Sequence, residues 1–398
     1  MKILWVKTDY LHPTDRGGQI RTLEMLKRLH ARHAVDYLTL ADPNNTEGPV
    51  RAHEYCRRHF AVPHQLADKR SLAFAADLWR GLVTELPVSI GRWKSEAMRR
   101  KARELDAAER YDAIVCDFLM PVASLDDWPR LVLFQHNVEA LLWERHVERA
   151  ATPLHRWYLR NQATKMAALE QRASREFGRV ICVSEQDAAL TRDRYGRQDA
   201  AWVPTGVDTD YFTAPAAPPK PVAELIFLGS MDWMPNVEGA AWMAADILPL
   251  IWAKRPETTI ALVGRRPDPK LQALAQDQRI KVSGTVDDVR PWLWGSAVSI
   301  VPLRIGGGTR LKIYEAMAAG VATVSTTIGA EGLDVRHEDN ILLADSAEAF
   351  ANACLRLLDQ PAERERIAAT ALAEVRAKHG WEAVTRRFEE LLVIAGRR

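Results

Sequence analysis

A glycine-rich loop bordered by basic residues is the part of this sequence best suited to bind an anion. Three glycines at 306–308 follow a short apolar run, and Thr309 can cap a helix that carries Arg310 and Lys312 in its first turn. A helix start normally favours acidic residues, because its N-terminus bears partial positive charge. Free backbone N–H groups and cations, with Arg304 entering the loop, instead suit a diphosphate from outside the chain. The alternative is a surface helix whose glycines serve only the turn.

The same helix carries a carboxylate in a position to bind hydroxyl groups. Glu315 lies about one turn beyond Lys312 and could accept hydrogen bonds from a sugar or a ribose. Leu311, Tyr314 and Ala318 form an apolar stripe at helical spacing. The segment from 297 to 326 therefore reads as strand, glycine loop, helix and strand.

Two further groups of polar or flexible residues follow strand-like runs in the first half of the chain. Gly17 and Gly18 come after the first such run and precede a helical pattern, and His136 with Asn137 ends another. In open α/β sheets ligands bind at the carboxyl ends of the strands, so we expect these residues near a ligand. A lone histidine is more often structural, and that interpretation stays open for His136.

The elements that must position these residues alternate between strand and helix in two successive series. A Pro/Ala-rich stretch at 214–224 separates them. The sequence predicts two doubly wound α/β domains facing a central cleft, at 1–213 and 225–381, with a C-terminal helix at about 382–398 crossing back to the first. One long helical stretch is expected from about 138 to 177.

Composition limits the class of protein. With 398 residues, 47% hydrophobic and 27% charged, the chain resembles an ordinary globular protein of two domains. Its net charge of +2 argues against nucleic acid as a partner. The four cysteines match no metal spacing, and the N-terminus reads as a first strand and not a signal peptide, so we expect a cytoplasmic protein.

A basic amphipathic segment at 69–103 suggests a contact with a membrane surface. It holds nine Lys or Arg against three Asp or Glu, together with leucines and tryptophans. Such a surface can bind the anionic inner leaflet of the plasma membrane. A solvated helix face covering the sheet explains the pattern equally well.

The order of these features resembles the retaining glycosyltransferase family 4 enzymes, which have the GT-B fold and use nucleotide-diphosphate sugars. The resemblance spans nearly the whole chain and rests on the early GG loop, His136 with Asn137, VPTGVDTDYF at 203–212, FLGSMD, LVGR, SGTVDDV and KIYEAMAAGVATVST. Within the family the sequence is most similar to bacterial sugar transferases of exopolysaccharide systems, including those associated with exosortase.

The resemblance implies roles for individual residues. Glu315 matches the second Glu of the family's Glu–seven residues–Glu motif, which binds the nucleotide ribose, and His136 matches the His that reaches the donor sugar. Arg265 and Val286 match the positions that form the walls of the nucleotide-base site in the family. The family's phosphate-side loops correspond to Gly17 and Gly18 in the first domain and to Gly308, Thr309, Arg310 and Leu311 in the second.

The sequence departs from the family pattern at two places. Gly307 stands where the first Glu of the motif is expected, which puts the donor sugar in doubt. In the segment FLGSMD, the family usually has a basic residue after the glycine, here Gly229, and this basic residue is absent. Arg304, Arg310 and Lys312 are the candidates to supply the missing phosphate charge.

The resemblance implies a hexosyltransferase that builds exopolysaccharide or another cell-surface polysaccharide. Its donor would be a nucleotide-diphosphate sugar and its acceptor a glycan or a polyprenyl-diphosphate-linked glycan, with anomeric configuration retained. No Asp-rich metal motif such as Asp-x-Asp stands near a predicted strand end, and the adjacent Asp287 and Asp288 would diverge on a strand, so no metal or other cofactor is expected.

Three other functions remain to be weighed. A nucleotide-sugar 2-epimerase would need several acid/base groups, of which only His136 stands out, and a non-catalytic nucleotide-sugar-binding subunit is suggested by Gly307. A dinucleotide oxidoreductase is disfavoured, since no Gly-x-Gly-x-x-Gly follows either first strand.

Overall fold

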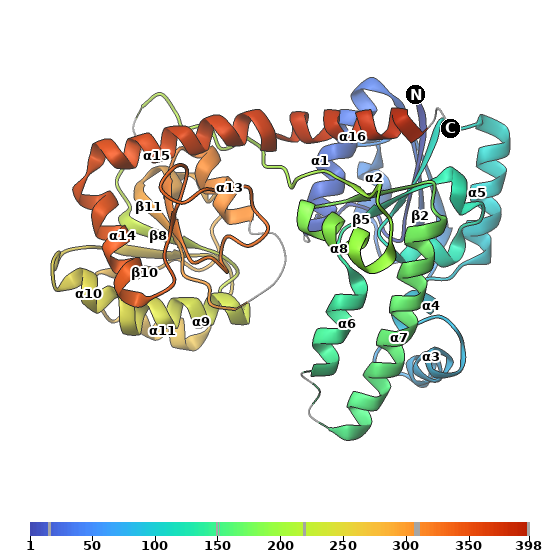
Figure 1. Ribbon diagram of the computed structural model, residues 1–398, viewed down its shortest axis with the longest axis horizontal. Coiled ribbons are helices and arrows are strands. Elements are labelled where there is room, and N and C mark those ends of the chain that lie inside the picture. Colours follow the sequence, from blue (N-terminus) through green and yellow to red (C-terminus); the bar gives the residue numbers. More distant parts are fainter. Residues whose placement is uncertain (15–16, 149, 151, 218–219, 306–310, 396–398) are drawn as a thin grey trace. The chain divides into compact units, whose positions relative to one another are not determined.

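The chain divides into two compact units, each with its own parallel sheet (Figure 1). The structure, a computed structural model, describes residues 1–398 except 15–16, 149, 151, 218–219, 306–310 and 396–398. The first unit comprises Met1–Pro204 and Val384–Arg398, and the second comprises Thr205–Ala383. This organisation confirms the predicted α/β class with two Rossmann-like sheets.

The first unit contains a seven-stranded parallel sheet in the order β3-β2-β1-β4-β5-β6-β7. Its strands are rich in apolar residues that are buried on both faces, as expected when helices cover a parallel sheet. The strand order reverses between β1 and β4, which creates a crevice at their carboxyl ends. The strands are β1 (Lys2–Lys7), β2 (Ala34–Ala41), β3 (Arg58–Pro63), β4 (Ala113–Asp117), β5 (Leu131–Gln135), β6 (Arg179–Cys182) and β7 (Ala201–Trp202).

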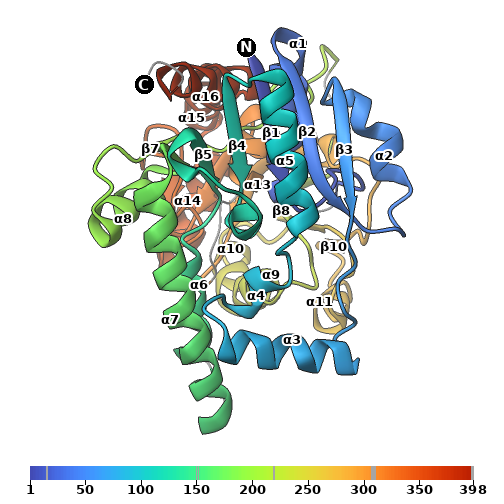
Figure 2. The ribbon, with the colours of Figure 1, turned by 90° about the vertical axis from the view of Figure 1, so that its right-hand side faces the viewer.

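Helices cover both faces of this sheet, and α5 crosses one face of it in Figure 2. Phe388 of the C-terminal helix packs at 5.6 Å from the Trp5 ring and at 5.0 Å from the Phe134 ring. The helices are α1 (Gly17–Arg32), α2 (Glu47–Arg51), α3 (Leu72–Val83), α4 (Val88–Gly91), α5 (Glu96–Glu109), α6 (Glu139–Glu148), α7 (Pro153–Glu176), α8 (Glu185–Tyr195) and α16 (Trp381–Ala395).

The second unit contains a six-stranded parallel sheet in the order β10-β9-β8-β11-β12-β13. Here the strand order reverses between β8 and β11. The strands are β8 (Ala223–Leu228), β9 (Ile260–Val263), β10 (Ile280–Val282), β11 (Ser296–Val301), β12 (Ala322–Ser325) and β13 (Leu342–Leu343). The helices are α9 (Met234–Trp242), α10 (Leu248–Trp252), α11 (Pro269–Leu274), α12 (Arg290–Trp294), α13 (Leu311–Ala318), α14 (Ala347–Asp359) and α15 (Pro361–Glu374).

One segment expected as a single long helix is interrupted, so this expectation was wrong. The stretch 138–177 forms α6 and α7, because Thr152 caps α7 by accepting a hydrogen bond from the N–H of His155 and Pro153 occupies the first helical position. The stretch 69–103 contains α3, α4 and the start of α5, with Pro87 before α4 and Ser95 capping α5. Strand β3 was not predicted.

The division between the units lies before the predicted boundary at 213. Val207 and Phe212 belong to the core of the second unit. The N–H of Val207 donates to the carbonyl of His379, and the indole N–H of Trp294 donates to the carbonyl of Phe212. Residues 205–213 therefore pack as part of the second unit, ahead of the Pro/Ala-rich stretch.

Candidate functional site

At the carboxyl edge of the first sheet, three charged or titratable side chains meet, with Asp117 between the other two. Lys7 ends β1, Asp117 ends β4, and His136 follows β5. The Nζ of Lys7 lies 3.0 Å from Asp117 Oδ2, and His136 Nε2 lies 2.7 Å from Asp117 Oδ1. The strand order reverses at this point, where ligands bind in open α/β sheets.

Hydrogen bonds and burial fix the protonation states in this cluster. The indole N–H of Trp5 and the hydroxyl of Thr22 donate to Asp117 Oδ2 at 3.1 and 2.8 Å. Burial would raise the pKa of Asp117, but Lys7, His136 and Trp5 together hold it well below its usual range. Burial lowers the pKa of His136 to about 4 against the opposing charge of Asp117. The imidazole is therefore neutral near pH 7, with Nε2–H donated to Asp117 and Nδ1 left as an acceptor.

Gly18 lies close to this cluster, because its missing side chain makes room for an aromatic ring. A Cβ at Gly18 would approach Phe118 Cζ to 2.5 Å and His136 Nδ1 to 3.7 Å. Phe118 has a φ of 69° and stacks on His136 at 3.7 Å between centroids, with Lys7 Nζ 3.9 Å from the ring centre. Gly17 differs, since a Cβ there would meet nothing within 4 Å. The structure thus brings Gly18 close to His136.

Asn137 belongs to a neighbouring hydrogen-bond network and forms no bond that the structure records to Asp117. Its Nδ2 donates to Glu139 Oε1 at 3.3 Å. Burial raises the pKa of Glu139 to about 7, with the charge of Glu170 adding to the shift. Asn137 is thus placed at the start of α6, where it helps to satisfy a partly buried carboxyl group.

A buried guanidinium that the sequence analysis did not single out also lies in this unit. Arg21 on α1 is only 6% exposed, and its Nη1 is buried without a hydrogen-bond partner among the described residues. Burial lowers the pKa of Arg21 to about 10, while the charges of Asp187 and Asp117 oppose that shift. A cation held this way adds positive potential beside Asp117 and His136.

In the second unit, Lys312 lies at the point where the strand order reverses. It occupies the first turn of α13, and its Nζ donates to Asn236 Oδ1 at 2.8 Å and lies 4.6 Å from the centre of the Phe227 ring. A Cβ at Gly229, directly after β8, would come within 2.8 Å of this Nζ. The structure therefore brings Gly229 and Lys312 together, with no acidic residue in the first turn of α13.

Glu315 follows Lys312 by one turn of the same helix. Burial raises its pKa, and the charge of Lys312 opposes that shift. The carboxyl group forms no hydrogen bond or ion pair among the described residues. The hydroxyl of the neighbouring Tyr314 accepts a hydrogen bond from the N–H of Asp334 at 3.1 Å. Glu315 is thus a partly buried carboxyl group available to a ligand.

The remaining predicted residues of this unit lie at the same sheet edge with different surroundings. Arg304 forms an ion pair with Glu238, its Nε donating to Oε1 at 2.8 Å, so its charge is already partnered. Arg265 is exposed after β9 and donates from Nε to Ser230 Oγ at 3.0 Å. Val286 follows β10 and packs partly buried against the core. Leu311, the first residue of α13, is partly buried.

Four predicted residues, Gly307, Gly308, Thr309 and Arg310, lie outside the described residues. Their proposed roles remain predictions from sequence. Five functional candidates were missed by sequence reasoning, namely Lys7, Arg21, Asp117, Phe118 and Asn236. Of these five residues, only Lys7 and Asp117 could have been found from the sequence, because they end strand-like runs.

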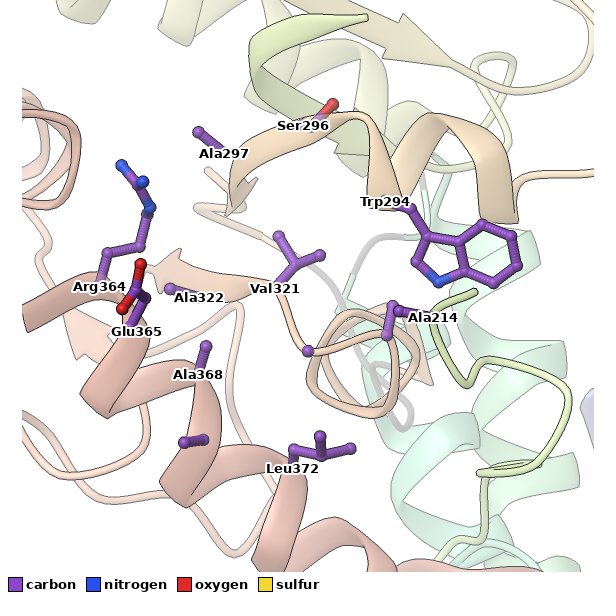
Figure 3. Close-up of a pocket in the computed structure, with 13 residues that line it drawn as sticks. Ala214, Trp294, Ser296, Ala297, Val321, Ala322, Arg364, Glu365, Ala368 and Leu372 are labelled. Atoms are coloured by element: carbon purple, nitrogen blue, oxygen red, sulfur yellow. The ribbon is translucent and has the colours of Figure 1, made fainter. Parts of the chain in front are cut away.

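Other features of the described chain bear on function. No group of three or more His, Cys, Asp or Glu side chains in the described ranges could hold a metal ion. No described helix is long and apolar enough to cross a membrane. A hollow of about 460 Å³ in the second unit lies at the amino ends of β11 and β12, beside Ser296 and Val321, and is lined largely by alanines with Trp294 and Leu372 (Figure 3). It is at the edge of the sheet opposite Lys312.

Two family models match most of the chain. The model described as Glycosyltransferase Family 4 matches residues 16–211, and the model described as Glycosyl transferases group 1 matches residues 223–360. A Klebsiella pneumoniae protein, described as an uncharacterized 44.6 kDa protein in the cps region, is 20% identical over 364 residues, covering 88% of this chain and 89% of that protein.

Solved structures share the fold over the whole chain. Sucrose-phosphate synthase from Thermosynechococcus elongatus has a TM-score of 0.66 at 18% identity, covering 98% of each chain. The HepE protein of Anabaena, solved in complex with UDP and glucose, has a TM-score of 0.63 at 14% identity, covering 98% of this chain and 99% of that one.

Proposed function

The chain belongs to the glycosyltransferases of the GT-B class, and from this we propose that it moves a sugar from a nucleotide-diphosphate sugar to a glycan or a lipid-linked glycan. The proposed transfer retains anomeric configuration and requires no metal ion. Its proposed place is exopolysaccharide or cell-surface polysaccharide biosynthesis, in the cytoplasm.

The observation that carries the donor assignment is the position of Lys312. Its ammonium group is oriented by Asn236 at the switch point of the second sheet, beside Gly229 and at the start of a helix without acidic residues. A helix N-terminus and a fixed cation together favour a phosphate group. Glu315, one turn away, would accept hydrogen bonds from the ribose hydroxyls.

In the proposed reaction the bond between the sugar's anomeric carbon and the diphosphate oxygen breaks, and the electron pair leaves with that oxygen. Lys312 stabilises the negative charge that develops on the leaving group. The acceptor hydroxyl attacks on the same face, and its proton passes to the departing phosphate oxygen. His136, neutral with Nδ1 as an acceptor, would hydrogen-bond a hydroxyl of the donor sugar.

The surroundings of Asp288, which follows Asp287 in the segment SGTVDDV, support metal independence. The Asp288 carboxylate accepts hydrogen bonds from Arg290 Nε at 3.0 Å and from Nη2 at 2.7 Å. These bonds hold its pKa below the usual range. We expect full transfer activity in excess EDTA, and activity that requires added Mg²⁺ or Mn²⁺ would contradict this part of the proposal.

One similar protein supports the polysaccharide context, and another supports the class of donor. One is described as lying in the cps region of Klebsiella pneumoniae, and HepE was solved with UDP and glucose. The decisive experiment is a thermal-shift panel of UDP-, GDP-, ADP- and TDP-sugars on the purified chain. A saturable rise in Tm with one donor class, with release of free nucleotide only when an acceptor is added, is expected. Donor conversion without acceptor would instead identify an epimerase, and no shift with any donor would overturn the proposal.

Peripheral binding to an anionic membrane is the proposed function of segment 69–103. Leu72, Trp79 and Val83 of α3 are 91%, 65% and 61% exposed, and Lys69, Arg70 and Arg80 flank them. Exposed apolar side chains bordered by cations suit the surface of an anionic leaflet.

Sedimentation with liposomes tests this contact. The chain should bind vesicles of phosphatidylglycerol and not those of phosphatidylcholine, and L72A/W79A should lose most of that binding. Val50→Ala, which changes a 71% exposed residue on α2, is the matched control. Equal sedimentation of both variants would leave segment 69–103 as a solvated face.

A further inference from the structure

The first unit contains a large pocket, and all the described residues that line it belong to this unit. It has a volume of about 940 Å³ and lies at the carboxyl ends of β1, β2 and β3. At one end it is bordered by Lys7, Gly18 and Phe118, the residues packed around Asp117 and His136. At another it is bordered by His64 and Trp93. The pocket thus connects to the cluster that contains His136.

The lining combines an aromatic platform with polar side chains. The rings of His64 and Trp93 stack at 5.8 Å with 28° between their planes, and His64 Nε2 lies 2.8 Å from the carbonyl oxygen of Arg92. Asn44 and Gln65 line the same pocket and are exposed. An aromatic pair that lines the pocket beside amide donors and acceptors is suited to a sugar, which has an apolar C–H face and a rim of hydroxyls.

Three charged groups of the lining already have partners. Lys7 is paired with Asp117, Glu47 Oε1 lies 2.8 Å from Arg51 Nη1, and Asp9 Oδ2 accepts a hydrogen bond from Gln19 at 3.1 Å. Asp42 Oδ1 accepts hydrogen bonds from the N–H and Nδ2 of Asn44, at 2.9 and 3.0 Å, and Asp42 forms no ion pair within the described part of the chain. Burial lowers the pKa of the lining His12, which leaves it neutral near pH 7.

We propose that this pocket binds an uncharged or amino-bearing sugar residue of the acceptor, packed against the His64–Trp93 pair, and that Asp42 discriminates against sugars bearing a carboxylate or phosphate. The inference rests on the proposed glycosyltransferase function and adds the chemical class of the acceptor. A negative group near Asp42 would lose its hydration and meet like charge. A diphosphate linking the glycan to a lipid would therefore lie outside the pocket.

Ligand-observed NMR on the full chain tests the pocket directly, using methyl β-glucoside, methyl β-glucosaminide and methyl β-glucuronide in the presence of UDP. The wild type should bind the glucoside about fivefold tighter than the glucuronide. Trp93→Leu should weaken glucoside binding about three- to tenfold, and Trp93→Phe should restore part of it. Asp42→Asn should reduce the difference in affinity between the glucoside and the glucuronide.

Matched controls separate these effects from loss of folding. Trp157→Leu changes a 58% exposed tryptophan on α7, and Asp68→Asn changes an acid whose Oδ1 also accepts an N–H two residues on, from Arg70. Both should bind all three glycosides like the wild type.

Two results would overturn the inference: unchanged glycoside binding in Trp93→Leu and Asp42→Asn, or tighter binding of the glucuronide by the wild type. A thermal shift with nucleotide sugars in the same samples reports on the donor site alone. Absent glycoside binding with an intact donor shift would remove the pocket assignment and leave the proposed function standing. Glycoside binding without any thermal shift from a nucleotide sugar would leave a sugar-binding pocket and remove the proposed transferase function.

Discussion

At the scale of single residues, Lys312 is positioned before any substrate arrives. Its ammonium group is oriented by Asn236 and by the face of the Phe227 ring, and the absence of a Cβ at Gly229 allows the Lys312 and Asn236 side chains to approach the backbone there. Orienting a cation in this way reduces the reorganisation needed when charge develops on a leaving group. The rigid surroundings of Lys312 therefore contribute to the proposed chemistry as much as its charge does.

Replacing Lys312 by alanine should weaken donor binding while leaving the fold nearly unchanged. A hydrogen bond to a charged group contributes about 1.5–3 kcal/mol, so we expect Kd for the nucleotide sugar to rise about ten- to a hundredfold. Calorimetric titration measures the change. Lys254→Ala is the control, because Lys254 also donates to an asparagine oxygen, Asn352 Oδ1 at 3.1 Å, on the surface. Equal affinities in both variants would remove the phosphate assignment.

His136→Ala should lower turnover with little change in nucleotide affinity. Its imidazole is held by Asp117 and by stacking on Phe118, which leaves Nδ1 as the acceptor for the proposed hydrogen bond to a donor sugar. Loss of one such positioned group costs about a hundredfold in rate. Steady-state kinetics, together with nucleotide titration, separate the two effects. If Tm falls sharply and affinity falls with it, His136 is structural.

The buried imidazole also predicts how stability depends on pH. Its folded pKa of about 4 lies below the unfolded value of about 6.5, so the unfolded chain binds more protons between these values. Stability should be highest above pH 6.5 with respect to this group and should fall as the pH decreases to 4. Urea unfolding should show a shallower pH slope in His136→Asn, whereas the exposed His53→Asn should keep the slope of the wild type.

At the scale of elements, the start of α6 is tied to α7 by one carboxyl group. Glu170 accepts hydrogen bonds from the N–H groups of Glu139 and Ala140, at 2.8 and 2.9 Å, and from the hydroxyl of Tyr195 at 2.7 Å. It thus satisfies free N–H groups at a helix N-terminus from a distant part of the chain. Because His136 and Asn137 immediately precede α6, this bond network also positions them.

Removing this anchor should reduce both stability and turnover. Glu170→Ala leaves several buried donors unsatisfied, and we expect a loss of about 3 kcal/mol or more in the free energy of unfolding. Glu170→Gln, which keeps an acceptor oxygen, should lose less. Glu176→Ala on the same helix breaks only an exposed pair with Arg172 and should leave the free energy of unfolding and kcat within error. Chemical denaturation and kinetics report the two quantities.

At the scale of the whole molecule, each unit has its own hydrophobic core, and the C-terminal helix belongs to both. Helix α16 begins at Trp381, and residues from Val384 onward are part of the first unit. Phe388 is fully buried against Trp5 and Phe134. The stability of the first unit therefore depends on the last residues of the chain.

Phe388→Ala should destabilise the first unit selectively. Truncating a buried phenylalanine costs about 3–5 kcal/mol. Hydrogen exchange should become faster in peptides from residues 1–204 and should change little in peptides from 225–360. Val393→Ala, on the same helix but 40% exposed, should leave exchange as in the wild type. Equal acceleration in both units would show that their cores are not independent.

The sequence alone determined the alternation of strands and helices, and with it the two parallel sheets and the sheet edges at which ligands bind. Those features follow from short-range apolar patterns and glycine positions, which the chain carries locally. It also placed His136, Gly18, Gly229, Lys312 and Glu315 at those edges. Breaks such as Thr152–Pro153 were readable in principle, yet the surrounding helical pattern concealed them.

Only the tertiary structure decided which side chains become partners. Asp117, Phe118 and Lys7 meet His136 because β1, β4 and β5 are neighbours in the sheet, and Arg304, which follows β11, is paired with Glu238 of α9. The proposed acceptor pocket combines residues from three strand ends with Trp93 from a distant loop. Such contacts depend on long-range strand order and burial, which no local spacing of residues encodes.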